Sequence, residues 1–283
     1  MRYATFGPTD IRVCVVGQGS WDIPERGARA KEAQLALRRG IELGMTHLDT
    51  AEMYGSGAVE ALLGKAIAGL PRERLFITSK VLPSNAGYAG TIAACERSLK
   101  RLGLDYLDLY LLHWPSSYPL AETMGALEAL VEQGKTRHIG VSNFDCEDML
   151  EARTYLRNVP LACNQVLYHL NERGIERRVL PAAREHRIAV VGYTPFGRGA
   201  FPRAAAAAGG VLGTIASKHG AGVRAIILAF LTRDPALFTI PKASRVEHVE
   251  ENARGGSLQL DAADIAAIDG TFPVGDDGPL ATL

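Results

Sequence analysis

Short apolar runs rich in Val, Ile, Leu and Tyr recur along the whole chain. Several of them, such as LDLYLL and AVVGY, are continuously apolar and do not alternate with polar residues. Strands that are buried on both faces have this pattern, which favours a parallel sheet covered by helices. The predicted strands are Arg12–Val16, His47–Thr50, Leu75–Lys80, Tyr106–His113, Thr136–Ser142, Leu161–Tyr168, Ala189–Thr194 and Leu237–Ile240.

Segments with helical periodicity lie between these runs, with apolar residues on one side and charged residues on the other. They predict helices over Ala30–Leu43, Thr91–Leu102, Leu120–Gln133, Glu147–Leu156, Glu176–His186 and Arg224–Thr232. Strand and helix alternate about eight times, with about 35 residues per unit, which is a normal size for a β-α unit. No change of composition marks a domain boundary. We therefore expect an α/β fold, with residues 1–283 forming a single (β/α)8 TIM barrel domain.

Two further segments carry a local structural signal. The sequence FGPTD near the N-terminus is typical of a turn, so we expect a short N-terminal hairpin that covers the bottom of the barrel. The run AAAAAGG at 204–210 is interpreted as the end of a helix or a loop.

The charge balance narrows the range of partners. The chain carries 31 Lys and Arg against 31 Asp and Glu, so its formal net charge is zero. A nucleic-acid partner is therefore not expected, although a local basic cluster would still suffice for one phosphate group. The longest apolar stretch, near 225–231, is too short to span a membrane, which takes about 20 residues. No secretory signal precedes the first strand, and none of the four cysteines forms a C-x-x-C pair, so a cytoplasmic protein with reduced thiols is expected.

Several familiar enzyme motifs are incomplete. The sequence GQGSW at 17–21 lacks the third glycine of a dinucleotide-binding loop, and GKT at 134–136 lacks the first glycine of a P-loop. The sequence GVSNF at 140–144 ends in Phe where a nucleophile elbow needs Gly. The seven histidines show no metal-ligand spacing, so no metal site is expected.

Polar residues stand where the predicted strands end, the position at which a barrel carries its chemistry. Each has an ordinary structural explanation when taken alone, such as a turn cap, a solvated lysine or a hydrogen-bonded core histidine. Their joint occurrence on one face instead favours a shared pocket. The residues are Asp49 with Tyr54 five residues later, Lys80, His113, Ser142, Asn143, Asn164, Gln165, Tyr193 and Lys242.

Four of these residues suit proton delivery to a carbonyl oxygen. The pKa of tyrosine is near 10, and a lysine ammonium beside Tyr54 favours the phenolate and lowers that pKa. Asp49 is the candidate partner for Lys80, and His113 can orient the substrate oxygen by a hydrogen bond. Because no nucleophile or metal motif is found, the reaction needs an external reductant, for which a nicotinamide hydride is the natural choice.

The segments that carry these residues resemble the aldo-keto reductase family. They are LDTAEMYG (48–55), TSK (78–80), DLYLLHWP (108–115), GVSNF (140–144), NQVLYH (164–169) and IPKAS (240–244), and they occur in the family's order. The resemblance extends from residue 17 to residue 252 and is closest to compact bacterial methylglyoxal reductase-like members. It implies a (β/α)8 barrel that binds NADPH (NADP⁺), with Tyr54 as general acid and Asp49, Lys80 and His113 completing a catalytic tetrad.

The resemblance also implies how the cofactor is held. The nicotinamide carboxamide is expected on Ser142, Asn143 and Gln165, with the ring stacked on Tyr193, although a Tyr193 that simply packs in the core is the alternative. Phe196 and Gly197 are expected under the pyrophosphate. The remaining cofactor-binding residues are expected to be Ser20, Trp21, Asp49, Lys242, Ala243, Ser244, Arg245, His248, Glu251 and Asn252.

One of these positions departs from many relatives, which have Arg where this chain has His248. Arg245 is the candidate to compensate, because a guanidinium can stack on adenine or pair with phosphate. Lys242 and Ser244 suit a 2′-phosphate, so we still expect NADPH to be preferred over NADH.

The expected substrate is a small carbonyl compound. Trp21 and Trp114 are expected to line its site with Tyr54 and His113, ordinary packing being the alternative for each tryptophan. The connection after His113 and the tail after residue 269 are short, so we expect an open pocket, broad specificity and a preference for activated aldehydes such as methylglyoxal. We expect a monomer or weak dimer. Two other classes stay open: a cofactor-bound scaffold subunit, and a different barrel enzyme such as a phosphate-handling isomerase or lyase.

Overall fold

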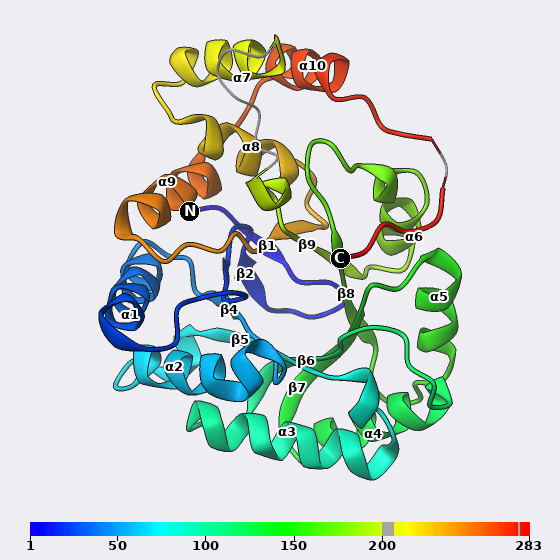
Figure 1. The fold of residues 1–283 in the computed structure, drawn as a ribbon. Helices are drawn as coiled ribbons and strands as arrows, with labels where there is room; N and C mark the ends of the chain where they lie inside the picture. Colours follow the sequence, from blue (N-terminus) through cyan, green and yellow to red (C-terminus); the bar gives the residue numbers. More distant parts are fainter. Residues whose placement is uncertain (200–206, 277) are drawn as a thin grey trace.

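Eight parallel strands form one curled sheet in a computed structural model that describes residues 1–199, 207–276 and 278–283 (Figure 1). In sheet order they are β10 (Leu237–Thr239), β9 (Ala189–Tyr193), β8 (Leu161–Leu167), β7 (Thr136–Ser142), β6 (Leu107–Leu112), β5 (Phe76–Val81), β4 (His47–Asp49) and β3 (Gln18–Gly19). Parallel bridges from Val16 to Thr239 and from Gly19 to Lys242 join the two ends of the sheet. The predicted (β/α)8 barrel is confirmed.

Helices surround the strands in Figure 1. They are α1 (Gly27–Glu42), α2 (Ala58–Ile67), α3 (Tyr88–Leu102), α4 (Leu120–Glu132), α5 (Cys146–Thr154), α6 (Val179–Glu185), α7 (Ala207–Lys218), α8 (Val223–Leu231), α9 (Val246–Ser257) and α10 (Ala262–Thr271). All six predicted helices are present, whereas α2, α7, α9 and α10 were not predicted. In the run 204–210, the first three residues lie outside the described part of the chain, and α7 begins at the fourth.

The N-terminal hairpin is present, but one of its strands was predicted as part of the barrel. β1 (Tyr3–Thr5) pairs antiparallel with β2 (Arg12–Cys14), so the predicted first barrel strand is wrong, and β3 takes that place. The run RVCVV is buried from its second residue onward, and burial alone does not reveal which strand pairs with it. Phe6, in the turn, is fully buried, with its ring 4.9 Å from that of Phe76 and 5.0 Å from that of Phe238. The hairpin thus closes one end of the barrel.

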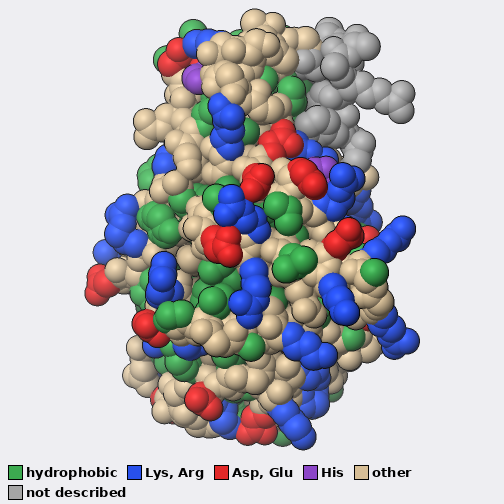
Figure 2. Space-filling view, turned by 90° about the vertical axis from the view of Figure 1, so that its left-hand side faces the viewer, with side chains coloured by type: hydrophobic (Ala, Val, Ile, Leu, Met, Phe, Trp, Pro, Cys, Tyr) green, Lys and Arg blue, Asp and Glu red, His purple; other side chains and the backbone are tan. Residues whose placement is uncertain are grey.

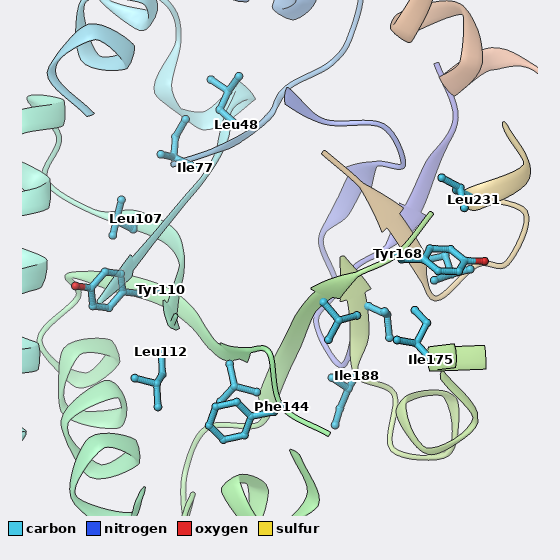
Figure 3. Close-up of a cluster of buried hydrophobic side chains, with 14 of the residues drawn as sticks. Leu48, Ile77, Leu107, Tyr110, Leu112, Phe144, Tyr168, Ile175, Ile188 and Leu231 are labelled. Atoms are coloured by element: carbon cyan, nitrogen blue, oxygen red, sulfur yellow. The ribbon is translucent and has the colours of Figure 1, made fainter. Parts of the chain in front are cut away.

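The core has two layers, because side chains alternate between the two faces of each strand. On β6, Leu109 and Leu111 point into the barrel, whereas Tyr110 and Leu112 pack between the strands and the helices. Figure 3 shows this outer layer, in which Tyr110 and Leu112 lie near α3 and α4. Burial on both faces explains why these strands are continuously apolar.

His47 makes the fold sensitive to acid. It lies inside the barrel with Nε2 3.2 Å from Thr78 Oγ1, and burial together with the charge of Lys80 lowers its pKa to about 3. The unfolded chain therefore binds more protons between pH 6.5 and 3, and stability is lost as the pH falls through that window, by up to about 1.4 kcal/mol per pH unit. Urea unfolding between pH 7 and pH 4 should show a shallower loss for His47→Gln. Equal slopes for the two proteins would contradict this assignment.

The outer surface carries charges of both signs. Figure 2 shows the face formed by α1, α2 and α9, where basic and acidic side chains both occur. Arg39 of α1 pairs there with Glu250 of α9 at 2.9 Å. Among the helices of the described residues, none combines the length and the hydropathy that a membrane span requires.

Candidate active site

A cavity of about 590 Å³ opens at the carboxyl ends of the barrel strands. Its lining includes most of the predicted strand-end residues, which the fold brings together from β4, β6, β7, β8 and β9. The residues around it are Gly19, Ser20, Trp21, Asp22, Asp49, Met53, Tyr54, His113, Trp114, Ser142, Asn143, Gln165, Tyr193, Thr194, Pro195, Phe196, Arg198, Ile240, Lys242 and Leu283.

A buried ion pair lies at the floor of this cavity. Lys80 is 0% exposed, and its Nζ donates to Asp49 Oδ1 at 2.6 Å and to the backbone oxygen of Thr50 at 2.8 Å. Gln165 Nε2 donates to the other carboxylate oxygen of Asp49 at 2.8 Å. Burial alone lowers the pKa of Lys80, but Asp49 and Tyr54 outweigh it and the net pKa is raised, so the ammonium stays charged.

Tyr54 meets this pair from the loop after β4, at the start of the short 3₁₀ helix η1 (Tyr54–Gly57). Lys80 Nζ donates to the phenolic oxygen at 3.4 Å. The charge of Lys80 favours the phenolate, as the sequence predicted, but burial has the larger effect and the pKa of Tyr54 is raised overall. The lower Tyr54 pKa that we expected is therefore wrong, because burial disfavours the charged phenolate more than Lys80 stabilises it. Tyr54 stays protonated and able to donate.

Glu52 fixes the loop that presents Tyr54, and sequence reasoning did not identify it. Its buried carboxylate accepts hydrogen bonds from the Leu82 backbone N–H and from Asn85 Nδ2, both at 2.9 Å. Arg97 of α3 lies 3.3 Å from its second oxygen. The β4 and β5 loops are therefore tied together through one acidic side chain. A Glu after a strand and two residues before a functional Tyr is the only signal for it in the sequence.

His113 follows β6 and faces the same cavity. Burial and the charge of Lys80 lower its pKa to about 2, so the imidazole is neutral near pH 7. Its ring meets that of Tyr54 edge-on at 5.8 Å and stacks on Trp114 at 3.9 Å. A neutral imidazole keeps one N–H donor, which suits a hydrogen bond to a carbonyl oxygen.

Amide and hydroxyl groups form a second network, which joins the first one at Gln165. Ser142 Oγ donates to the backbone oxygen of Gln165 at 2.8 Å, and Asn143 Nδ2 donates to that of His113 at 2.9 Å. Tyr193 donates its hydroxyl proton to Asn143 Oδ1 at 2.7 Å. These contacts connect four of the predicted cofactor residues, and Tyr193 is half-buried at the cavity wall. The four residues are Ser142, Asn143, Gln165 and Tyr193.

The backbone around the cavity is strained at four non-glycine positions among the described residues. Asp22, Asn143, Thr194 and Arg198 have φ of 56°, 63°, 56° and 51°. Asparagine tolerates the left-handed region, whereas a β-branched residue such as Thr194 rarely adopts it. Strained non-glycine residues of this kind tend to cluster at binding sites.

The segment predicted to hold the adenosine phosphate lies beside the cavity. Only Lys242 of this segment lines the cavity among the described residues. Ser244, His248 and Glu251 are partly exposed, and Ala243 is buried in the core without a polar side chain. Asn252 is 1% exposed, yet neither its Nδ2 nor its Oδ1 has a hydrogen-bond partner among the described residues. A buried amide without partners is costly and suggests a ligand that supplies them.

The chain matches the model described as the Aldo/keto reductase family over residues 15–271. The chain belongs to this family. It is 42% identical to the methylglyoxal reductase YeaE of Escherichia coli (strain K12) over 93% of both chains, and 36% identical to a glyoxal reductase of Bacillus subtilis (strain 168) over 84% of this chain and 83% of that protein.

Solved structures agree with this aldo/keto reductase assignment. A Klebsiella pneumoniae aldo-keto reductase, solved in complex with NADPH, is 38% identical to this chain and superposes with a TM-score of 0.92. The match covers 100% of both chains. This aldo/keto reductase is accordingly an oxidoreductase. In its described residues, no group of three or more His, Cys, Asp or Glu side chains is arranged to hold a metal ion.

Some cavity residues of this aldo/keto reductase were not predicted. They are Gly19, Asp22, Met53, Thr194, Pro195, Arg198, Ile240 and Leu283. Most lie on loops, where no strand-end pattern marks them. The guanidinium of Arg198 lies 4.5 Å from the centre of the Trp21 ring, so two loops meet across the cavity mouth. The segment after α10 passes α6 and ends beside the barrel strands in Figure 1, which brings Leu283 into the cavity wall.

Proposed function

We propose that this aldo/keto reductase uses NADPH to reduce small, activated aldehydes and ketones to alcohols, with Tyr54 as the general acid. The observation that carries the proposal is the buried Lys80–Asp49 pair beneath the Tyr54 hydroxyl, at the floor of an accessible cavity. Tyr54 is protonated and can donate one proton, and the charged Lys80 beside it stabilises the phenolate that remains.

The residues present fit NADPH. A carboxamide needs donors and acceptors together, and Ser142, Asn143 and Gln165 supply both. The unpartnered amide of Asn252 suits a purine edge, and Lys242 provides a charge for phosphate. The Klebsiella relative was solved with NADPH, and another solved structure of an aldo-keto reductase from that organism holds NADP and acetate.

NADPH, when bound, supplies a hydride for the carbonyl carbon. His113 and Tyr54 would hold the carbonyl oxygen, and the Tyr54 proton moves to that oxygen as negative charge develops on it. Lys80 donates to the Tyr54 oxygen, so the tyrosinate left behind is stabilised by the ammonium 3.4 Å away. Asp49 and Gln165 keep that ammonium in place.

The cavity wall favours a small substrate. Trp21 is 41% exposed and Trp114 stacks on His113, so both offer apolar surface next to the proton donor. A second carbonyl beside the first makes hydride attack easier, and weak binding then suffices. The relatives named methylglyoxal reductase and glyoxal reductase support 2-oxoaldehydes as the substrate class.

A panel of aldehydes and ketones, assayed by NADPH consumption, tests the substrate class. We expect methylglyoxal, glyoxal and similar 2-oxoaldehydes to give the highest kcat/KM. Steroids or large sugars giving far higher values would overturn the proposed class, and no turnover of any carbonyl would overturn the reductase itself.

The same assay tests cofactor preference. We expect a kcat/KM for NADPH at least about tenfold above that for NADH, because one charge-assisted phosphate contact is worth about 1.4 kcal/mol or more. Purified enzyme assayed with both reductants at one fixed methylglyoxal concentration gives the ratio. An equal or higher value with NADH would show that His248 has removed the phosphate preference.

A further inference from the structure

Helix α8 brings an arginine to the segment that departs from the family pattern. Arg224 is the second residue of α8, and its guanidinium lies 4.6 Å from the centre of the Phe196 ring, which lines the cavity. Its Nε is 3.9 Å from Glu251 Oε2 on α9. Arg224 therefore connects the loop after β9 with the helix that carries His248, Glu251 and Asn252.

The two helices pack closely at this point. Gly222 precedes α8, and a Cβ added there would overlap the Glu251 side chain. His248 lies one helical turn before Glu251 on α9. Burial, and then the charges of Arg224 and Arg245, lower the pKa of His248. Both arginines are thus close enough to His248 to act on its charge.

We infer that Arg224 supplies, from α8, a guanidinium for the cofactor 2′-phosphate, in place of the arginine that α9 lacks at position 248. The inference rests on the proposed use of NADPH and names a specificity-determining residue for it. Lys242, from the segment between β10 and α9, and Arg224, from α8, would then contact the phosphate from two separate elements of the fold. Arg224 is absent from the site predicted from sequence, since it stands in a helix whose other residues read as apolar core.

The local contacts favour Arg224 over Arg245 for this role. Arg245 is exposed, and its Nε lies 3.6 Å from the carboxylate of Glu247, which is also exposed. An ion pair between two solvent-exposed side chains orients the guanidinium only weakly. Arg224 is only partly exposed and is oriented by the Phe196 ring on one side and Glu251 on the other. A guanidinium carries five N–H donors in a planar fork, enough to contact a carboxylate and a phosphate together.

Binding of 2′,5′-ADP and 5′-AMP, measured by calorimetry on the whole protein, tests this role without turnover. The two probes differ only in the 2′-phosphate. We expect Arg224→Gln to weaken 2′,5′-ADP by about tenfold or more and 5′-AMP by less than about twofold. The double variant Arg224→Gln/His248→Arg should recover most of the lost 2′,5′-ADP affinity, because it returns a guanidinium to α9.

The matched control is Arg254→Gln, which removes an equal charge from α9 at an exposed position where the arginine bonds the Gly220 carbonyl. It should leave both affinities nearly unchanged. Equal weakening of both probes by Arg224→Gln, or no weakening of either, would overturn the inference while leaving NADPH use intact. A wild-type protein that binds neither 2′,5′-ADP nor NADPH would overturn the proposed function as well.

Discussion

Tyr54→Phe should lower kcat for methylglyoxal reduction by about 10²–10⁴-fold while leaving NADPH binding nearly unchanged. The substitution removes the one acidic proton beside Lys80 Nζ and keeps the ring that meets His113 edge-on. Steady-state NADPH consumption reports the first quantity, and quenching of protein fluorescence on NADPH titration reports the second.

Tyr118→Phe is the matched control, because it removes a tyrosine hydroxyl at an exposed position outside the cavity. It should retain wild-type kcat. Full activity in Tyr54→Phe would show that another group donates the proton. A wild-type protein that binds NADPH and reduces no carbonyl would instead favour the scaffold class.

The polar ends of the strands made the floor of the site predictable. Asp49 is the last residue of β4, Lys80 is the second-last residue of β5 and His113 directly follows β6. A closed barrel brings these strand ends together. Their partners were harder to foresee. Glu52 and Arg198 act from loops, and Arg224 acts from a helix whose apolar residues dominate its pattern.

The prediction of the fold was correct where the hydrophobic pattern of a segment allowed one interpretation. It was wrong where an apolar run could pair either within the barrel or within the hairpin. Strand β6 alternates between two buried layers, so its continuous LDLYLL run identifies a barrel strand. The run beginning at Arg12 is just as apolar, but it pairs within the hairpin. Helix α10 begins at an Asp261 capping box and has a weakly sided pattern, so periodicity does not reveal it.

The charge balance also hid local detail. The net charge is zero, yet Lys242, Arg224 and Arg245 gather near α9, with Glu247 and Glu251 among them. Whole-chain charge therefore gives no net excess of cations for a polyanion, and it says nothing about a site for one phosphate. The packing of α8 on α9 shows that Arg224 lies beside this segment, which the sequence pattern does not reveal.

Lys80→Met should destabilise the fold by about 3–5 kcal/mol, because it leaves Asp49 as a buried carboxylate without its cation. Gln165 would remain as a donor to one of its oxygens. Urea unfolding at pH 7 measures the loss. Reductase activity should disappear as well, since the tyrosinate loses the ammonium that stabilises it.

The double variant Asp49→Asn/Lys80→Met separates stability from catalysis. It removes both charges and leaves a neutral amide whose oxygen can still accept from Gln165, so most of the lost stability should return. Activity should stay as low as in Lys80→Met. A double variant that unfolds as easily as the single one would mean that the pair itself, and not the stranded carboxylate, holds this end of the barrel together. Recovery of activity in the double variant would contradict a role for Lys80 in proton delivery by Tyr54.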